Sequence, residues 1–575
     1  MSEQHDRNLE QIARDGAFDV VVVGGGINGI GVYRELALQG LRVLLVERND
    51  FCSACSSAPS RMIHGGLRYL ENGEFNLVWE ALRERDALLA NAPHMVRPLP
   101  TTIPIKSVFS GILNGAIGFL GWSARPASRG ALPIKIGLTL YDFITRQRRA
   151  LPTHTFRNAR TTYEHWPALA RGLRYSATYY DAWISYPERL GVEMIADVAA
   201  MAPESVALNY AEIVAREGGF ALTDKASGRT FAVSAGVVVN ATGAWVDEAY
   251  PLLSGRAKLP APFVSGTKGS HLIIDNRALH DALRGHMIFF ENADGRVCIV
   301  FPYLGKVLAG ATDIRVERVE RVRCEPDERD YILDALRGVF PGIAISADEV
   351  VFSYSGIRPL PTSDHEFTGR ISRGHDVQRL EGNVPQFCLI GGKWTTFRAL
   401  AEQAADAVLA ELGETRRRST LDVPIGGGAA FSGADKVAEG LVARYRIFAT
   451  RAGHLVDLYG TRASAVLEFC ASRADDVALV EGSEFTAAEI AFIARNEFVE
   501  SLSDVLLRRT PLAIRGEVSG ALIERVATLL ALELGWDEAR RRREIAAFGA
   551  ELSNYHGVSR ETLDKRSENR SGTCV

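Results

Sequence analysis

The chain has 575 residues, and its content of 47% hydrophobic and 24% charged residues is ordinary for a globular protein. Its length suggests roughly two to four domains, and a net charge of −4 gives no reason to expect a nucleic-acid partner. The seven cysteines are scattered and odd in number, so they predict no disulfide framework. The polar first 17 residues lack the apolar core of a signal peptide, which predicts a cytoplasmic protein.

The stretch from Phe18 to Glu47 has the order strand, glycine-rich turn, helix, strand. A β-branched run (20–23) predicts a strand buried on both faces, and the turn after it has the pattern G-x-G-x-x-G, with Gly24, Gly26 and Gly29. Glycines there let the backbone approach a pyrophosphate, which the N-terminus of the next helix (27–39) would attract. Glu47 lies 23 positions after Gly24, where a carboxylate binds an adenosine ribose and repels a 2′-phosphate. The pattern favours FAD or NAD over NADP, and the alternative is a glycine-rich turn without a ligand.

Two later stretches also place a turn directly after a strand. VVVNATGAW (237–245) ends a β-branched run at Thr242 and Gly243, as expected for a strand end beneath a pyrophosphate or for an ordinary turn. FCLIGGKWTTFRALAEQAADAVLAEL (387–412) has a strand, a Gly-Gly turn and a helix whose N-terminal dipole would point at a ligand above the turn. Cys52-x-x-Cys55 could be a redox pair, but without a thioredoxin-like pattern around it we interpret it as two small loop residues.

Several spaced motifs carry a resemblance to a known family. SRMIHGGLRYLE (60–71) followed by EALRERDALLANAPH (80–94) resembles the FAD-dependent glycerol-3-phosphate dehydrogenases. Further segments agree in the same order: GTKGSHLII (266–274), FPYLGKVLAGATD (301–313), SGIRPL (355–360), IGGKWTTFRALAE (390–402) and NEFVESLSDVLLRRT (496–510). The resemblance runs from Phe18 to about Tyr555, and several motifs in one order are more specific than any single motif.

With the strand signals, the resemblance implies an α/β fold built around a discontinuous Rossmann-like FAD-binding domain. We expect this domain at 18–95, 175–255 and 350–405, and an α+β substrate domain with an antiparallel sheet at 96–174 and 256–349. Residues 406–555 read as a C-terminal helical domain. The polar residues 556–575 predict a disordered tail.

Two residues are candidates for the base that takes the hydroxyl proton of an alcohol substrate. His271 follows Lys268-Gly269-Ser270 at a predicted strand end, and an imidazole suits proton transfer near neutral pH. The alternative for His271 is a structural histidine bonded to the backbone. Lys393 lies in the Gly-Gly turn, where burial or nearby cations could lower its pKa; its alternative role is a cation that stabilises the reduced flavin.

Arginines are the candidates for binding a substrate phosphate, because a guanidinium grips an anion through paired hydrogen bonds. Arg358 lies between Gly356 and Pro359 in a predicted rigid turn, and Arg373 follows 15 residues later. Arg68 and Tyr69 would complete the pocket. For each arginine the alternative is a surface salt bridge.

The resemblance places further residues beside the cofactor. In addition to Gly24, Gly26, Gly29 and Glu47 they are Ser56, Ser57, Arg61, His64, Gly65, Gly66, Thr242, Gly243, Gly392, Lys393, Thr395 and Thr396. The family usually has Thr at Cys55, Lys at Arg61 and Tyr at Phe397. These departures mean that the resemblance specifies the cofactor more closely than the substrate.

The resemblance implies oxidation of sn-glycerol 3-phosphate to dihydroxyacetone phosphate, with FAD passing electrons to a membrane quinone. The alternatives are a related dehydrogenase or oxidase of another polyol phosphate, and a non-catalytic scaffold stabilised by FAD. Residues 107–124 (SVFSGILNGAIGFLGWSA) carry no charge, and cations flank them, which predicts an interfacial membrane segment; a buried hairpin or a contact in a homodimer is the alternative. We therefore expect a cytoplasmic protein bound peripherally to the inner face of the membrane.

Overall fold

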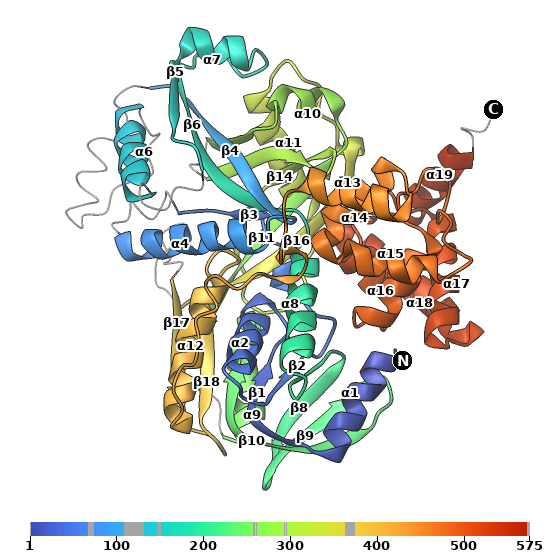
Figure 1. The fold of residues 1–575 in the computed structure, drawn as a ribbon. Helices are drawn as coiled ribbons and strands as arrows, with labels where there is room; N and C mark the ends of the chain where they lie inside the picture. The colour runs from blue at the N-terminus through green and yellow to red at the C-terminus, as the bar shows by residue number, and fades with distance from the viewer. Residues whose placement is uncertain are drawn as a thin grey trace.

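The computed structural model describes residues 2–66, 74–107, 131–145, 151–256, 259, 261–292, 294, 296–362 and 374–571. Two sheets and a helical C-terminal domain make up these residues (Figure 1). None of the described helices combines the length and the apolar character that crossing a membrane requires.

The first sheet contains the predicted dinucleotide unit. Its strand order is β17 (His375–Leu380), β18 (Gln386–Gly391), β10 (Thr230–Asn240), β1 (Ala17–Val23), β2 (Val43–Val46) and β7 (Val206–Leu208), with β8 (Ala211–Arg216) and β9 (Gly219–Asp224) attached to β10. The four strands from β18 to β2, and β7 beside them, run parallel. Val20 and Val22 face one apolar cluster and Val21 another, so β1 is buried on both faces as its sequence predicts.

Helices cover both faces of this sheet. On one face α2 (Ile27–Leu38), α8 (Pro187–Met201) and α12 (Phe397–Leu412) pack together (Figure 1). On the other face lie α1 (Glu3–Arg14), α9 (Val246–Ser254) and the β8–β9 hairpin. The carboxyl ends of β1, β2, β10 and β18 meet at one edge, where a doubly wound fold binds its ligand.

The second sheet is almost wholly antiparallel. Its order is β15 (Ile314–Arg315), β11 (Val264–Ile274), β14 (Lys306–Gly310), β13 (Val297–Tyr303), β12 (Met287–Glu291), β4 (Val96–Ile105), β6 (Tyr175–Ile184) and β3 (Met62–Ile63), with β16 (Val350–Pro361) on β11 and β5 (Thr155–Asn158) on β6. Only the β4–β12 pair among these described strands is parallel. Its helices are α4 (Phe75–Asn91), α6 (Ala131–Thr145), α7 (Ala159–His165), α10 (Arg277–Leu283) and α11 (Pro326–Val339).

The strand pairing differs from the predicted domain limits at two places. We expected residues from 175 and from 350 in the FAD-binding part, but β6 pairs with β4 along its whole length, and β16 pairs with β11 from Val264–Pro361 to Ile274–Val350. Both strands therefore belong to the second sheet. A strand's sequence pattern shows that it is buried but not which sheet contributes its hydrogen-bond partners.

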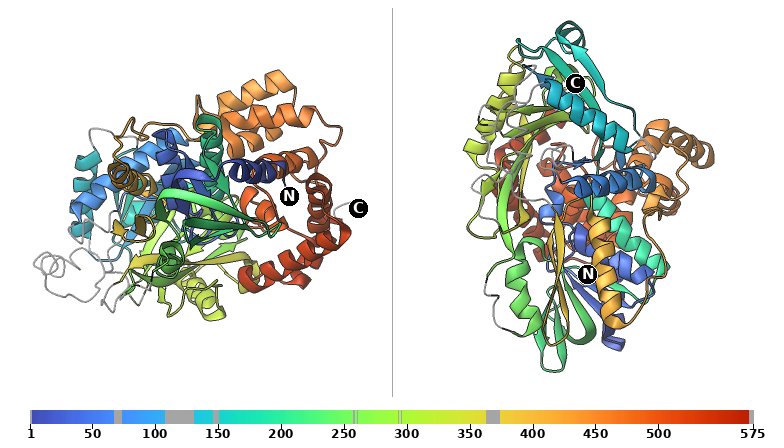
Figure 2. Two further views of the ribbon diagram at one scale, coloured as in Figure 1. Left: turned by 90° about the horizontal axis from the view of Figure 1, so that it is seen from below. Right: turned by 90° about the vertical axis from the view of Figure 1, so that its left-hand side faces the viewer.

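The C-terminal domain is helical, as predicted. It contains α13 (Ala434–Tyr445), α14 (Ala449–Tyr459), α15 (Ala463–Ala471), α16 (Ala487–Asn496), the π-helix η7 (Asp504–Arg509), α17 (Gly520–Leu534), α18 (Glu538–His556) and α19 (Arg560–Ser571). Figure 2 shows it on one side of the two sheets, with α1 beside it.

The predicted disordered tail is wrong for residues 560–571. Although the segment is polar, Leu563 is buried and Arg566 donates from Nη2 to the carbonyl of Val351 (3.0 Å) and from Nη1 to that of Val518 (3.3 Å). A few specific contacts to β16 and the start of α17 therefore order a helix that composition alone does not indicate.

Candidate active site

The turn between β1 and α2 is built for glycine. Gly24 has a φ of 110°, and a Cβ there would lie 2.5 Å from the carbonyl oxygen of Ala241. A Cβ on Gly29 would lie 1.9 Å from the carbonyl oxygen of Gly24. Helix α2 thus sits too close to the turn, and the turn too close to β10, for any side chain at these two positions.

The carboxylate of Glu47 closes this turn from the end of β2. The N–H of Gly25 donates to Oε2 (2.7 Å) and the N–H of Asn49 donates to Oε1 (2.8 Å). Burial raises the pKa of Glu47 although both amides favour the ionised form. The acid predicted to bind a ribose therefore also fixes the backbone of the glycine turn.

The loop after β2 reaches back to the N-terminus of α2. Ser56 Oγ accepts from the N–H of Ile27 (3.0 Å), and the carbonyl of Ser56 accepts from Trp394 Nε1 (3.1 Å). Ser57 instead donates to the carbonyl of Ala54 within its own loop (2.8 Å). Of the two predicted serines, the structure places Ser56 at the helix N-terminus.

The turn between β18 and α12 lies beside α2. A Cβ on Gly392 would be 2.3 Å from Nδ2 of Asn28, which donates to the carbonyl of Gly391 (3.2 Å). Thr395 Oγ1 accepts from the N–H of His64 (3.2 Å). The predicted segments around residues 24–29, 64 and 392–396 are thus brought together. We call residues 24–29, 47, 56, 242–243 and 391–396, at the carboxyl ends of the parallel strands, the cofactor cradle.

The cradle offers unsatisfied polar groups that a ligand would bind. Asn28 Oδ1 and Thr396 Oγ1 are buried and have no hydrogen-bond partner among the described residues. Thr242 Oγ1 donates to Asn240 (2.7 Å), and a Cβ on Gly243 would meet no atom within 4 Å. Buried polar atoms normally have partners, so Asn28 Oδ1 and Thr396 Oγ1 are groups to which a bound FAD could offer hydrogen bonds.

His271 and Arg358 lie on one face of the second sheet. In the β11–β16 ladder His271 is opposite Tyr354 and stacks on it, with ring centroids 5.0 Å apart. Arg358 crosses over Gly269, where a Cβ would be 1.9 Å from Nη2. Its Nη1 donates to Asp313 Oδ1 (3.0 Å) and its Nη2 to the carbonyl of Thr312 (3.2 Å).

The imidazole of His271 is buried without a described hydrogen-bond partner. It is 2% exposed, and neither ring nitrogen has a hydrogen-bond partner among the described residues. Burial lowers the pKa of His271 to about 3, with further lowering by the charges of Arg358 and Arg61. The ring is therefore neutral at physiological pH, as a proton acceptor must be.

Lys393 belongs to a different group of charged residues. Burial raises the pKa of Glu80, and the charge of Lys393 offsets part of this rise. Burial also lowers the pKa of His375 to about 4, and the charge of Lys393 adds to this lowering. His375 Nδ1 lies 3.7 Å from Glu80 Oε1. Glu80 and His375 could not be predicted from the sequence, since neither belongs to a recognised motif.

Arg61 has contacts other than those predicted. Its guanidinium donates to both carboxylate oxygens of Glu188 (3.3 and 3.1 Å) and lies over the rings of Tyr303 and Tyr354. Its cofactor role stays a prediction, and its contact with the ring of Tyr354 supports the tyrosine on which His271 stacks. Next in the same segment, Gly65 N–H donates to Asp181 Oδ1 (2.8 Å) and Gly66 has a φ of 78°. Arg68, Tyr69, Arg373 and 108–124 lie outside the described residues.

Comparison with known proteins decides the family. Residues 19–407 match the FAD dependent oxidoreductase family, and residues 418–541 match the C-terminal domain of alpha-glycerophosphate oxidase. A glycerol-3-phosphate dehydrogenase of Synechocystis sp. is 34% identical over 94% of this chain and 97% of its own. The aerobic glycerol-3-phosphate dehydrogenase of Escherichia coli is 32% identical over 86% of this chain and 93% of its own.

The chain belongs to the FAD-dependent glycerol-3-phosphate dehydrogenase family. A solved structure of such a dehydrogenase from Bacillus halodurans has the same fold, with a TM-score of 0.74 and 24% identity over 96% of this chain and 98% of that one. The predicted fold class and the predicted FAD cofactor are confirmed.

In this family member, a buried acid supports Arg358 from behind the sheet. Glu328 on α11 accepts from Ser270 Oγ (2.8 Å) and Thr312 Oγ1 (2.7 Å) and pairs with Lys268 Nζ (2.5 Å). These contacts fix Thr312, whose carbonyl holds Arg358. Sequence reasoning did not single out Glu328, although its place as the third residue of α11, in the capping box Glu325-x-x-Glu328, marks a helix start.

Proposed function

We propose that this protein oxidises sn-glycerol 3-phosphate to dihydroxyacetone phosphate with FAD as its cofactor and a quinone as electron acceptor. One observation carries the assignment of the site: the loop that caps α2 also lies against the face of His271 and Arg358. A Cβ on Gly356, between Tyr354 and Arg358 on β16, would be 2.8 Å from Ala58 Cβ and 3.6 Å from Cys55 Cα. The cofactor cradle and the candidate substrate residues therefore adjoin.

The residues have complementary tasks under this proposal. Arg358 binds the phosphate, because a guanidinium held in place by Asp313 and Thr312 keeps a fixed positive charge at this site that attracts an anion. His271 accepts the hydroxyl proton of the substrate at an unpartnered ring nitrogen. Bound FAD supplies the two-electron acceptor. Lys393 stays the second candidate for the base, and Arg68, Tyr69 and Arg373 stay predicted phosphate ligands.

A quinone acceptor requires contact with a membrane. Phe75 and Trp79 on α4 are 41% and 54% exposed, and Leu132 on α6 is 43% exposed. The two helices pack through Val78, Leu82 and Tyr141. Exposed aromatic and apolar side chains of this kind mark interfacial contacts, and they support peripheral binding to a membrane, whose inner face stays the predicted side.

Anaerobic bleaching of the flavin by a panel of polyol phosphates tests the substrate. Glycerol 3-phosphate should bleach the flavin, and Arg358→Ala should raise its KM at least about tenfold with FAD still bound, because a charged hydrogen bond contributes about 1.5–3 kcal/mol. Bleaching by another polyol phosphate alone supports the related-enzyme alternative, and no bleaching supports the scaffold. Reoxidation that is fast with oxygen and slow with quinone would reject the acceptor.

A further inference from the structure

The segment Asp50–Cys52 lies directly against the glycine turn of the cofactor cradle. Cys52 N–H donates to the carbonyl of Gly25 (2.9 Å), and a Cβ on Gly25 would be 2.6 Å from the ring of Phe51 and 2.7 Å from Cβ of Glu47. Three residues after the predicted ribose ligand, the chain therefore packs on the backbone that a pyrophosphate must approach. Any displacement of this segment displaces the turn.

The C-terminal domain contacts this segment through a buried cluster of ion pairs. Arg509 donates from Nη1 and Nη2 to the two oxygens of Asp50 (2.7 Å each), and Arg508 Nε donates to Oδ2 (2.5 Å). The side chains of Asp50 and Arg509 are completely buried. Both arginines belong to the π-helix η7, a rare helix type that is frequent at functional sites.

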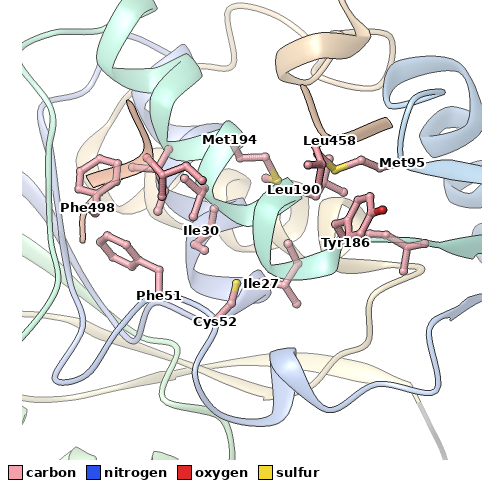
Figure 3. Close-up of a cluster of buried hydrophobic side chains, with 14 of the residues drawn as sticks. Ile27, Ile30, Phe51, Cys52, Met95, Tyr186, Leu190, Met194, Leu458 and Phe498 are labelled. Carbon is pink, nitrogen blue, oxygen red and sulfur yellow. The ribbon is translucent and has the colours of Figure 1, made fainter. Parts of the chain in front are cut away.

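An aromatic contact and a shared amide reinforce the same junction. The rings of Phe51 and Phe498 meet edge to face with centroids 5.4 Å apart, and Figure 3 shows both beside Ile30 of α2. Asn209 Nδ2 donates to Asp50 Oδ1 (3.2 Å) and to the carbonyl of Phe498 (2.9 Å). The C-terminal domain and its neighbour Asn209 therefore make charged, polar and apolar contacts with two consecutive loop residues, Asp50 and Phe51.

Asp50 is ionised in this cluster at neutral pH. Burial alone would raise the pKa of Asp50, but Arg509 and Arg508 outweigh it and lower this pKa to about 2. A buried bidentate pair is costly to break by removal of one partner, because the other charge stays buried without compensation. Such a pair therefore fixes the position of Asp50 relative to the π-helix η7.

We propose that Arg509 is a positioning residue of the cofactor cradle, through which docking of the C-terminal domain and binding of FAD are coupled. Arg509 touches no cradle residue itself; it holds Asp50, and the Asp50–Cys52 segment holds Gly25 and Glu47 in the geometry that FAD needs. Coupling between two binding events is reciprocal, so FAD must also strengthen docking of the domain. This coupling depends on FAD and not on the substrate proposed above. A negative substrate assay therefore does not contradict the coupling, and an unchanged FAD dissociation constant does not contradict the proposed substrate.

The dissociation constant of FAD, measured by flavin fluorescence on apoprotein, tests the proposal in the full chain. Arg509→Ala should raise this constant by about tenfold or more, as couplings of this kind do. Arg509→Lys should give an intermediate value, because lysine keeps the positive charge but cannot form the paired hydrogen bonds of a guanidinium. The matched control is Arg451→Ala, which breaks the buried Arg451–Glu489 pair elsewhere in the C-terminal domain. The control should lower the melting temperature of the apoprotein and leave the FAD dissociation constant unchanged.

Two results would overturn the proposal. One is an unchanged FAD dissociation constant in Arg509→Ala; the other is an equal rise in Arg451→Ala, which would show a general effect of lost stability. If Arg509→Ala does not fold, the coupling is tested by two other measurements, on the Asp50→Asn variant and on the wild-type apoprotein. Asp50→Asn should weaken FAD binding, and FAD should slow proteolysis of the wild-type chain between α12 and α13; no effect in both measurements rejects the coupling.

Discussion

Replacing Gly269 by alanine would displace the Arg358 guanidinium while leaving the strand that carries it in place. The added Cβ would lie 1.9 Å from Nη2, 2.4 Å from Cζ and 2.7 Å from Nη1 of Arg358. Non-bonded atoms stay about 3.5 Å apart, so Nη2 of the guanidinium must move by roughly 1.6 Å and Cζ by roughly 1.1 Å. Its hydrogen bonds to Asp313 and Thr312, at 3.0 and 3.2 Å, do not survive such a shift.

The expected result is a large rise in KM for glycerol 3-phosphate. A displaced guanidinium loses a charged hydrogen bond of about 1.5–3 kcal/mol to the phosphate, which corresponds to a rise of roughly ten- to a hundredfold. Steady-state kinetics measure KM and kcat, and the flavin spectrum checks that FAD remains bound. Gly338→Ala is the control, since a Cβ there meets nothing within 4 Å. A correctly folded Gly269→Ala enzyme with unchanged KM would refute the phosphate role of Arg358.

Local patterns predicted the parts of the site that depend on neighbours in the chain. The β1–α2–β2 unit follows from its β-branched runs, its glycines and Glu47, and the turn before α12 follows from Gly391-Gly392. Each of these features is decided by backbone conformation or by close approach within about 30 residues. The segments that these patterns mark lie together in the structure, and their contacts with FAD stay a prediction.

Features that depend on distant partners could not be predicted in the same way. The pairing of Arg61 with Glu188, of Asp50 with Arg509 and of Glu328 with Thr312 each joins segments that no local pattern connects. The same holds for helix α19, whose stability comes from contacts to β16 and α17. The resemblance identified the family's motif residues but not the buried charges that position them.

Two further experiments concern the membrane and the base. Replacing Phe75 and Trp79 together by serine should release the protein from liposomes and leave bleaching of the flavin by glycerol 3-phosphate intact, since both side chains are exposed on α4; continued sedimentation with liposomes would exclude this surface as the anchor. The pH profile of kcat/KM tests His271. Its pKa of about 3, lowered from 6.5 by burial and by Arg358 and Arg61, keeps the ring neutral throughout the range of the assay. An acidic limb due to His271 therefore cannot appear near its ordinary pKa of about 6.5, and activity should stay level down to about pH 5. A limb near about pH 6.5 that His271→Asn abolishes would show that the ring titrates freely, and the buried, unpartnered base would have to be abandoned.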